Sequence, residues 1–347
     1  MDIQTITTWF CANKRAFPWR KNPTPYRVLV SEIMLQQTQA TRVIPFFLRW
    51  MEQFPSLEKL ALAPEQAIIK AWEGLGYYSR ARSLQKAART IVEKFNGKIP
   101  STKKELLTIP GIGPYTAGAI LSFAFHKKAA AVDANVIRLL SRLKEQNIRV
   151  KELEAFLEKS LPTTSPWIAM EALIELGALI CRRRPLCENC PLSQECLSKQ
   201  RGTTTRFPPT TSQQKISLWR DVALIVAKNK VLVCQRSGKK IMSGLFEFPF
   251  FESKPSGRGE KAFLRHLKKL SLNLSIIHSL CPVTHSFTRY KATLYPLILS
   301  SPHEFSWPEG VWVPIEELSS LAFSSGHKKI MGSALPILRT YKKRSSY

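Results

Sequence analysis

The segment from Leu107 to Ile120 constrains the fold of this chain more than any other, because two glycines flank one apolar residue between a helix end and a new helix. It reads Leu-Thr-Ile-Pro-Gly-Ile-Gly-Pro-Tyr-Thr-Ala-Gly-Ala-Ile. Gly111 and Gly113 allow positive φ, and such a turn points backbone N–H groups at an anion beside the start of the second helix. We therefore predict a helix-hairpin-helix that holds a DNA phosphate without reading sequence. A bare Gly-x-Gly would also fit a plain helix C-cap, and the longer context favours the hairpin.

The charge of the chain favours the same kind of partner. Lys and Arg number 52 against 25 Asp and Glu among 347 residues, a formal charge of +27 that suits a polyanion. A generally basic proteome or a membrane-surface protein would show the same excess. No apolar run reaches the roughly 18 residues that a membrane span needs, and the first residues lack the basic start and apolar core of a signal peptide. We expect a cytoplasmic protein that binds nucleic acid and no membrane.

A change of pattern along the chain predicts two domains. Residues 1–198 carry helical periodicity, interrupted by Pro and Gly, and 44% hydrophobic residues in the chain suffice for two cores. Residues 199–217 are rich in Thr, Gln and Pro with little to bury, which is typical of a linker. Residues 218–347 contain β-rich runs, and the first two of these indicate a hairpin. The predicted strands are Val222–Ala227, Val231–Cys234, Tyr290–Leu299 and Val311–Val313. We expect a mostly α first domain and an α+β second domain.

Asp133 stands where a helix should begin, in Ala131-Val-Asp-Ala-Asn-Val-Ile-Arg, with Asn135 close by. One interpretation is an N-cap, which stabilises a helix by about 1 kcal/mol. The other is catalytic, because a helix N-terminus favours the ionised carboxylate that a cationic sugar transition state needs. The two interpretations are compatible.

Cleavage of a glycosidic bond usually needs a second carboxyl group, which protonates the leaving group. Glu32 is the candidate, because its neighbours Val28, Leu29, Ile33 and Leu35 are apolar. Burial would raise the pKa of Glu32 from about 4.3 to about 6.5 and keep its proton available. A solvated helical glutamate is the alternative interpretation.

Four of the seven cysteines crowd into one short run and indicate a metal site. They are Cys181, Cys187, Cys190 and Cys196. A zinc ribbon normally offers two separated Cys-x-x-Cys knuckles, whereas this run has one pair flanked by single ligands, which favours a [4Fe–4S] cluster over zinc. The remaining Cys11, Cys234 and Cys281 are scattered and are interpreted as ordinary buried thiols.

Several motifs together resemble one family of DNA repair enzymes. They are Pro18-Trp-Arg, Ser31-Glu-Ile-Met-Leu-Gln-Gln-Thr-Gln, Gly74-Leu-Gly-Tyr-Tyr-Ser-Arg-Ala-Arg, the glycine hairpin and Val132-Asp-Ala-Asn-Val. The chain resembles the MutY adenine DNA glycosylases of the endonuclease III superfamily over nearly its whole length. The resemblance implies excision of adenine that is mispaired with 8-oxoguanine or guanine in double-stranded DNA. We also expect a monomer.

By this resemblance, Glu32 protonates the flipped adenine and Asp133 stabilises the sugar cation or its covalent adduct, while Asn135 and Tyr115 support that centre. Relatives with strand-cleaving lyase activity place a lysine at the position of Tyr115, and its amine forms a Schiff base with the sugar. Because Tyr115 offers no amine, we expect a monofunctional glycosylase that leaves an abasic site after water replaces the base.

The resemblance also assigns residues that contact the base and its surroundings. Trp19 and Arg20 match positions that line the adenine pocket of the family. Gln37, Leu75 and Tyr77 match residues that fill and sense the gap left when a base is extruded, a role for which the Tyr77 ring suits stacking. Individually, Trp19 and Leu75 would more often be plain core residues.

From Trp219 onward the chain resembles the Nudix-like lesion-recognition domain of the family, including Gly244-Leu-Phe-Glu-Phe-Pro. A working Nudix hydrolase needs a cluster of glutamates, whereas residues 259–274 contain only Glu260. We therefore do not expect pyrophosphate hydrolysis.

The chain departs from the family pattern at three places. The 8-oxoguanine-sensing turn usually reads Phe-Ser-His, whereas here Thr288 keeps the hydroxyl and Arg289 replaces the imidazole with a cation. The first two cysteines are separated by five residues instead of six, which shortens the loop. Ile137 stands where bacterial relatives often carry a basic residue.

Two other classes of function remain open. A bifunctional pyrimidine-lesion glycosylase of the endonuclease III type would need a lysine in the hairpin and would usually end soon after the cysteines. A non-catalytic protein that binds damaged DNA would be expected to lose Glu32 or Asp133. Neither pattern is present.

Overall fold

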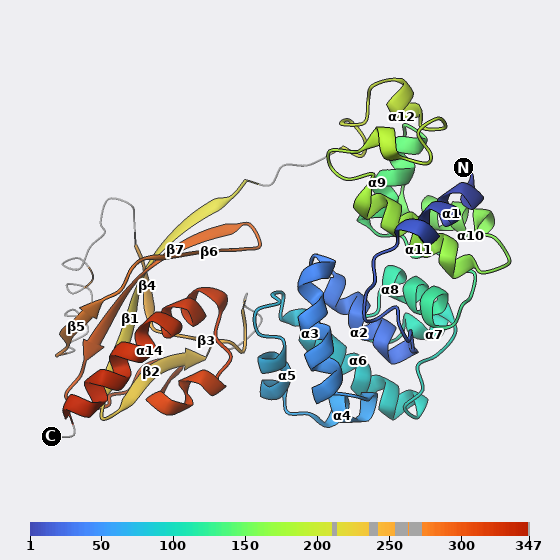
Figure 1. Ribbon diagram of the computed structural model, residues 1–347. Coiled ribbons are helices and arrows are strands. Elements are labelled where there is room, and N and C mark those ends of the chain that lie inside the picture. The colour runs from blue at the N-terminus through green and yellow to red at the C-terminus, as the bar shows by residue number, and fades with distance from the viewer. Residues whose placement is uncertain (210–213, 236–241, 254–262, 264–272, 346–347) are drawn as a thin grey trace. The chain divides into compact units, whose positions relative to one another are not determined.

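Figure 1 shows the computed structural model, which describes residues 1–209, 214–235, 242–253, 263 and 273–345. The chain forms two compact units, which we describe separately. The first unit comprises residues 1–63 and 79–211, and the second comprises residues 64–78 and 212–347. Within the described residues, no helix is both long and apolar enough to cross a membrane.

The first unit is helical, as the sequence predicts. Its α-helices are α1 (Ile3–Asn13), α2 (Pro25–Leu35), α3 (Ala40–Gln53), α4 (Leu57–Leu62), α6 (Ser79–Phe95), α7 (Lys103–Leu106), α8 (Pro114–Ala119), α9 (Ala134–Leu143), α10 (Val150–Ser160), α11 (Pro166–Leu179) and α12 (Leu197–Gln200). A π-helical turn, η1 (Ile120–Ala124), continues α8. Large apolar side chains such as Phe10, Phe47 and Trp50 are almost fully buried and form the core of this unit.

Helix α2 lies in the interior of the first unit and is fixed at both ends. At its start, Thr24 accepts a hydrogen bond from the Arg27 backbone N–H at 3.3 Å. At its end, the buried guanidinium of Arg80 donates to the carbonyls of Ile33 and Met34 at 3.1 and 2.8 Å. A cation at a helix C-terminus satisfies carbonyls that have no partner in the helix and complements its dipole. The residues between these ends therefore hold a fixed position.

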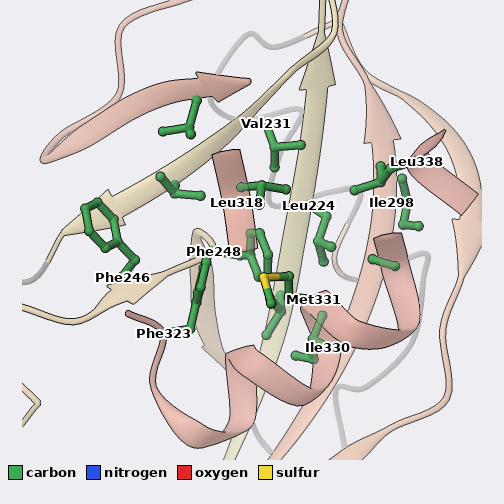
Figure 2. Packing of buried hydrophobic residues seen from close by; sticks show 14 of the residues in the cluster. Leu224, Val231, Phe246, Phe248, Ile298, Leu318, Phe323, Ile330, Met331 and Leu338 are labelled. Atoms are coloured by element: carbon green, nitrogen blue, oxygen red, sulfur yellow. The ribbon is translucent and has the colours of Figure 1, made fainter. Parts of the chain in front are cut away.

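The second unit is built on a mixed sheet, which confirms the predicted α+β class. Its strands are β1 (Ile216–Ala227), β2 (Lys230–Gln235), β3 (Phe246–Glu247), β4 (Phe250–Ser253), β5 (Ser275–Ser279), β6 (Val283–Phe287), β7 (Tyr290–Ser300) and β8 (Gly310–Pro314). The order β3-β2-β1-β7-β5 places the parallel pair β1 and β7 at the centre, while β4, β6 and β8 pair with β1, β7 and β2. Helix α14 (Ser325–Ser345) covers one face, where Leu224, Phe248 and Ile330 are packed together (Figure 2).

The predicted hairpin between β1 and β2 is confirmed. Lys228 and Asn229 form its two-residue turn, both with positive φ, at 44° and 63°. Two consecutive left-handed residues match the twist of the flanking strands, which is why asparagine is favoured in such turns. The other predicted strands correspond to β7 and β8.

A short segment from the helical half of the sequence packs with the second unit. It contains α5 (Glu65–Ala71) and the turn that follows. Glu73, whose side chain is 4% exposed, accepts hydrogen bonds from the Phe323 backbone N–H at 2.9 Å and from the Lys328 ammonium at 2.6 Å. Lys70 donates to the carbonyls of Ser319 and Leu321, each at 2.8 Å. These contacts join residues about 250 positions apart, which no linear pattern indicates.

Part of the segment interpreted as a linker is packed against the first unit. Thr203 donates to Oε1 of Glu145 at 2.6 Å, and the carbonyl of Phe207 accepts from Arg142 at 2.9 Å. The domain boundaries predicted at residues 198 and 218 stay a prediction.

Candidate active site

A cavity of about 890 Å³ opens in the first unit and contains most of the residues singled out in its sequence. The predicted residues that line it are Trp19, Arg20, Glu32, Gln37, Tyr115, Asp133 and Asn135. They come from residues 19–37, residue 115 and residues 133–135, so the fold brings together side chains that are far apart in the sequence. The roles predicted for them stay predictions, and the geometry below describes what they can do.

Glu32 lies in the middle of α2 and its side chain is almost completely enclosed, at 6% exposure. Oε2 accepts a hydrogen bond of 2.7 Å from the hydroxyl of Tyr115. Burial raises the pKa of Glu32 to about 7, although the Tyr115 hydrogen bond opposes this. The nearby carboxyl groups of Asp133 and Glu171 raise the pKa further. Glu32 therefore retains a proton close to neutral pH, as a general acid must.

Asp133 caps α9, as predicted. Oδ1 accepts from the Val136 backbone N–H at 2.8 Å, and Oδ2 accepts from the Asn135 side-chain amide at 2.7 Å. The hydrogen bonds at the helix N-terminus favour the ionised form, as expected, and lower the pKa of Asp133. Burial of the carboxyl group is the larger effect, so the pKa is raised above its usual value.

Asn135 is itself held by a residue that the sequence interpretation did not select. Arg138 donates from Nη2 to the Asn135 side-chain oxygen at 2.7 Å and to the Gly177 carbonyl at 2.8 Å. Its Nε donates to the carbonyl of Cys181 at 2.6 Å. A Cβ on Gly177 would lie 2.8 Å from Cβ of Asn135, so glycine is needed for this approach of α11 to α9. A continuous chain of hydrogen bonds thus runs from Asp133 to the cysteine-rich loop.

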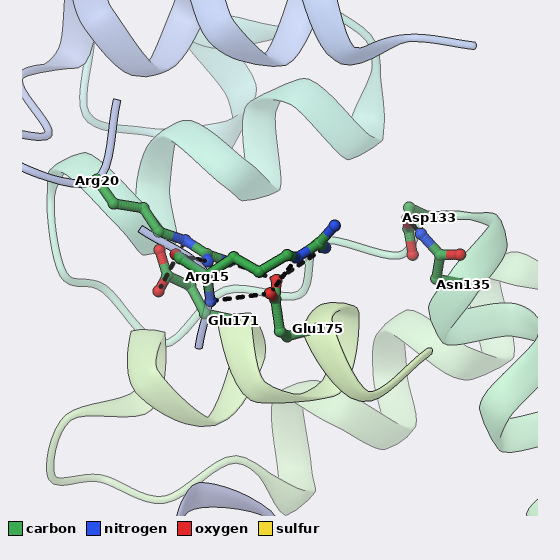
Figure 3. A network of polar contacts seen from close by, with 6 residues as sticks. All are labelled: Arg15, Arg20, Asp133, Asn135, Glu171 and Glu175. Atoms are coloured by element: carbon green, nitrogen blue, oxygen red, sulfur yellow. Dashed lines mark hydrogen bonds and ion pairs between the residues drawn. The ribbon is translucent and has the colours of Figure 1, made fainter. Parts of the chain in front are cut away.

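One wall of the cavity carries a cluster of carboxylates and guanidinium groups (Figure 3). Arg20 was predicted there, whereas Arg15, Glu171 and Glu175 were missed. Glu175 accepts from Nε of Arg15 at 2.6 Å and from Nη2 of Arg20 at 3.0 Å. Nε of Arg20 lies 3.6 Å from Oε2 of Glu171. Glu171 and Glu175 are four residues apart on α11, a spacing visible in the sequence but common to ordinary helices.

The aromatic residue assigned to the base pocket serves two purposes. Trp19 is 7% exposed and its ring stacks on Phe17 at 4.8 Å while it lines the cavity. The core interpretation and the pocket interpretation of Trp19 are thus compatible. Gln37 is exposed at the cavity with a left-handed φ of 54°.

The structure places three predicted contact residues in the second unit. Leu75 is buried at 4% exposure, as a plain core residue would be. Tyr77 is 43% exposed and adopts φ 51°, just after Gly74 and Gly76, which also have positive φ. Thr288 is exposed at the tip of the β6–β7 hairpin with φ 48°, an unusual conformation for a β-branched residue.

The glycine hairpin lies between α7 and α8. Gly111 adopts φ 85°, and a Cβ there would lie 2.8 Å from Cβ of Ser83, so no other residue fits without strain. Gly113 could adopt positive φ but does not. It is extended, at φ −92° and ψ 178°, because one left-handed residue reverses the chain and the next must begin α8. A Cβ on Gly113 would meet nothing within 4 Å, so the space there stays open.

The cysteines of the predicted metal site have free thiols and face one small apolar cavity beside Leu139 and Leu192. They are Cys181, Cys187, Cys190 and Cys196. Within the described part of the chain, no group of three or more His, Cys, Asp and Glu side chains is arranged to hold a metal ion.

The residues around these thiols affect how easily the thiols could lose their protons to a bound metal group. Arg142 is 4% exposed, and its guanidinium lies 3.5 Å from Sγ of Cys181 and donates to the Arg182 carbonyl at 2.6 Å. Burial raises the pKa of the Cys190 thiol to about 11. A metal group would therefore have to displace protons from these thiols, which the adjacent Arg142 cation would favour.

Comparisons with known proteins describe both units. A family model for the HhH-GPD superfamily base excision DNA repair protein matches residues 30–163, and a NUDIX domain model matches residues 221–333. Adenine DNA glycosylases of Rattus norvegicus and Homo sapiens are each 32% identical to this chain over 94% of its length, and the matches cover 76% and 72% of those proteins. The adenine DNA glycosylase of Buchnera aphidicola subsp. Baizongia pistaciae is also 32% identical, over 94% of this chain and 89% of its own.

Solved structures resemble the helical part of the chain. A thermostable thymine-DNA glycosylase superimposes with a TM-score of 0.55 at 32% identity, covering 57% of this chain and 95% of that protein. An endonuclease III trapped as a covalent intermediate with DNA superimposes with a TM-score of 0.53 at 25% identity, covering 58% of this chain and 94% of that protein.

Proposed function

The chain belongs to the adenine DNA glycosylase family of the HhH-GPD superfamily, and we propose that Glu32 and Asp133 carry out its excision of adenine. The family resemblance and the two-part fold predicted from the sequence are confirmed. The proposal concerns which residues act, which base pairs are substrates and which cofactor is present. The observation that carries it is the hydrogen bond between Tyr115 and buried Glu32, whose pKa is raised to about 7, in the cavity that also contains Asp133.

In the proposed reaction, Glu32 gives its proton to a ring nitrogen of the flipped adenine. The bond between N9 and the sugar carbon breaks, and its electron pair stays with the base. The positive charge that develops on the sugar faces the carboxylate of Asp133, whose position is fixed by α9 and Asn135. Water adds to the sugar carbon and gives a proton to a carboxylate, so the products are free adenine and an abasic site.

The wall formed by Arg20 and Glu171 supplies a basis for choosing adenine. A guanidinium donor and a carboxylate acceptor lie side by side there, 3.6 Å apart. Adenine offers ring nitrogens that accept and an exocyclic amine that donates, which matches this pair. Guanine would present its O6 acceptor where adenine has the amine, and a carboxylate would repel it.

We propose that the enzyme is monofunctional. The hydroxyl of Tyr115 occupies the position where a lyase would need an amine, and it is engaged by Glu32. The product strand is then expected to stay intact until alkali or heat cleaves the abasic site. Nicking by the protein alone would contradict this part of the proposal.

The second unit is proposed to read the base opposite adenine, with a preference for 8-oxoguanine over guanine. Support comes from the strained, exposed Thr288 at a hairpin tip, since such strain is concentrated at functional sites. The neighbouring Arg289 lies over the ring of Tyr290 at 5.4 Å, so its cation is close to the same tip. The stretch with the single Glu260 falls outside the described residues, apart from Phe263, Asn273 and Leu274.

We further propose that the four cysteines hold a [4Fe–4S] cluster and not zinc. All four thiols facing a single apolar cavity supports this, and the uneven spacing favours iron–sulfur over a zinc ribbon. When bound, the group would cross-link the loop that Arg138 and Arg142 contact. Double-stranded DNA is the proposed partner, which the charge of +27 suits. The protein is proposed to act as a monomer, since Glu32, Tyr115 and Asp133 of one chain already line one cavity.

The test is single-turnover cleavage of duplexes that contain adenine opposite 8-oxoguanine, guanine or thymine. We expect wild-type protein to release adenine opposite 8-oxoguanine and guanine, and Glu32→Gln to release none at a measurable rate. Glu52→Gln, an exposed glutamate on α3, is the matched control and should behave as wild type. No adenine release by wild type, or full activity of Glu32→Gln, would remove the proposed mechanism.

A further inference from the structure

Glu175 is the most enclosed carboxylate of the cavity wall, at 1% exposure, although the proposed chemistry gives it no role. Its two oxygens accept hydrogen bonds from two different arginines (Figure 3). Arg15 contributes its backbone N–H at 3.2 Å, Nε at 2.6 Å and Nη2 at 3.2 Å. Arg20 contributes Nη2 at 3.0 Å.

Arg20 is held in position by several contacts while it lines the cavity. Its Nη1 donates to the Arg15 carbonyl at 3.0 Å, and the guanidinium lies 5.5 and 5.1 Å from the ring centres of Phe10 and Phe17. Nε of Arg20 faces Glu171 and lies 3.6 Å from its Oε2, which is longer than the 3.0 Å hydrogen bonds to Arg15 and Glu175. The side chain of Arg20 is 18% exposed, so it has little freedom to find another position.

The pKa values of the two glutamates of α11 shift in opposite directions as a result. Burial acts to raise the pKa of Glu175, but the hydrogen bonds and charges of Arg15 and Arg20 outweigh it and hold the pKa below its usual value. Burial raises the pKa of Glu171, which the single contact with Arg20 only partly offsets. The oxygens of Glu175 are thus fully used in hydrogen bonds to Arg15 and Arg20. Glu171 keeps oxygen atoms that can accept hydrogen bonds from a ligand.

We propose that Glu175 is a positioning residue for base selection, which fixes Arg20 so that Arg20 and Glu171 together recognise the exocyclic amine and ring nitrogen of adenine. This inference rests on the proposed function of the cavity. Glu175 has no spare hydrogen-bonding contact of its own to offer the base. It acts through Arg20, because a long and flexible side chain recognises a ligand well only when its position is fixed beforehand.

The experiment compares single-turnover excision of adenine with that of purine, which lacks the exocyclic amine, each opposite 8-oxoguanine. In Glu175→Gln, we expect the adenine rate constant to fall at least about tenfold and the purine rate constant to fall much less. The adenine-to-purine ratio should therefore fall relative to wild type. Equal losses on both substrates, with an unchanged ratio, would show a merely structural role and overturn the inference.

Arg20→Gln keeps the inference testable even if Glu175→Gln does not fold. That variant leaves Glu175 paired with Arg15, and it should lower the ratio to the same extent. Adding Glu175→Gln to Arg20→Gln should lower the ratio no further, since both act through one group. An unchanged ratio in Arg20→Gln, or additive effects in the double variant, would overturn the inference.

The control substitution is Glu152→Gln, which removes an exposed ion pair with Arg149 on the same unit. Its ratio should equal that of wild type. Failure of the proposed function is distinguishable, because wild-type protein would then release no adenine at all. Active wild type with an unaltered ratio in Glu175→Gln would contradict the present inference alone.

Discussion

The hydroxyl of Tyr115 donates a hydrogen bond of 2.7 Å to Oε2 of Glu32, and this contact joins the glycine hairpin to helix α2. The hydrogen bond shifts the pKa of Glu32 in a direction that can be measured. A hydrogen bond to a carboxylate favours the ionised form, and it therefore lowers the pKa of Glu32 against the larger effect of burial, which raises it to about 7.

The wild-type enzyme should lose activity as the pH rises through about 7. Glu32 must carry its proton in order to give it to adenine, and the protonated fraction falls about tenfold for each pH unit above the pKa. Single-turnover rate constants measured from pH 5.5 to pH 9, roughly spanning that value, would show this descending limb. A rate that stays constant over this range would contradict Glu32 as the general acid.

Replacement of Tyr115 by Phe should move the descending limb to higher pH. The substitution removes the hydrogen bond that favours ionised Glu32 and leaves the burial in place, so the pKa of Glu32 rises. The same pH series on Tyr115→Phe is the measurement. Glu52→Gln, which changes an exposed residue of α3 outside the cavity, is the control, and a limb that moves to lower pH in Tyr115→Phe would be incompatible with this account.

Arg138→Gln should slow adenine excision by about tenfold or more while binding of intact DNA changes little. The guanidinium is the link that holds Asn135, and Asn135 in turn holds Oδ2 of Asp133. Excision rates and equilibrium binding to a duplex with a non-cleavable adenine analogue separate the two effects. Arg149→Gln, an exposed arginine of the same unit, serves as the comparison. A loss confined to DNA binding would argue against this role of Arg138.

Glu73→Ala should destabilise the second unit by about 1 to 2 kcal/mol, because the buried Phe323 backbone N–H loses its acceptor. The side chain is 4% exposed, and its removal leaves the Phe323 N–H and the Lys328 ammonium without this carboxylate. Urea unfolding followed by tryptophan fluorescence gives the free energy. Exposed Glu65→Ala on the neighbouring helix is the control. A change below about 0.5 kcal/mol, typical of surface substitutions, would show that this contact contributes nothing.

Purified protein should contain iron and sulfide and show broad visible absorbance that Cys190→Ala removes. The thiol of Cys190 faces the same cavity as its three partners, so loss of one ligand should lower occupancy of the site. Elemental analysis alongside the spectrum is decisive. Stoichiometric zinc without visible absorbance would replace the proposed cluster. Cys11→Ala should leave the metal content unchanged, because Cys11 is exposed; the interpretation of Cys11 and Cys281 as buried thiols is wrong, since both are exposed.

Features that depend on neighbours in sequence were predictable. Asp133 caps α9, Gly111 makes the left-handed turn, and Lys228 with Asn229 turns the first hairpin of the sheet. Each of these is fixed by the conformational preference of one or two residues. Gly113 shows the limit of such a prediction, because the sequence shows that a glycine can adopt positive φ but not whether it does.

Features that depend on which distant groups meet were not predictable. Glu175 and Arg15 are 160 positions apart, and Glu73 and Phe323 are 250 apart. The residues next to them in the sequence give no sign that either pair is in contact. The pKa of Asp133 illustrates the same point, since its helix cap was visible in the sequence and its burial was not.

The sequence by itself determined the family, the two folds and the identity of the residues in the glycine hairpin and its surroundings, because motifs record short-range chemistry. Only the tertiary structure decided how the pKa values of Glu32 and Asp133 shift and how Arg20 is held in position. The reason is physical. Proton affinity and side-chain position depend on the distance to every nearby charge and on the exclusion of water, and both quantities exist only after the chain has folded.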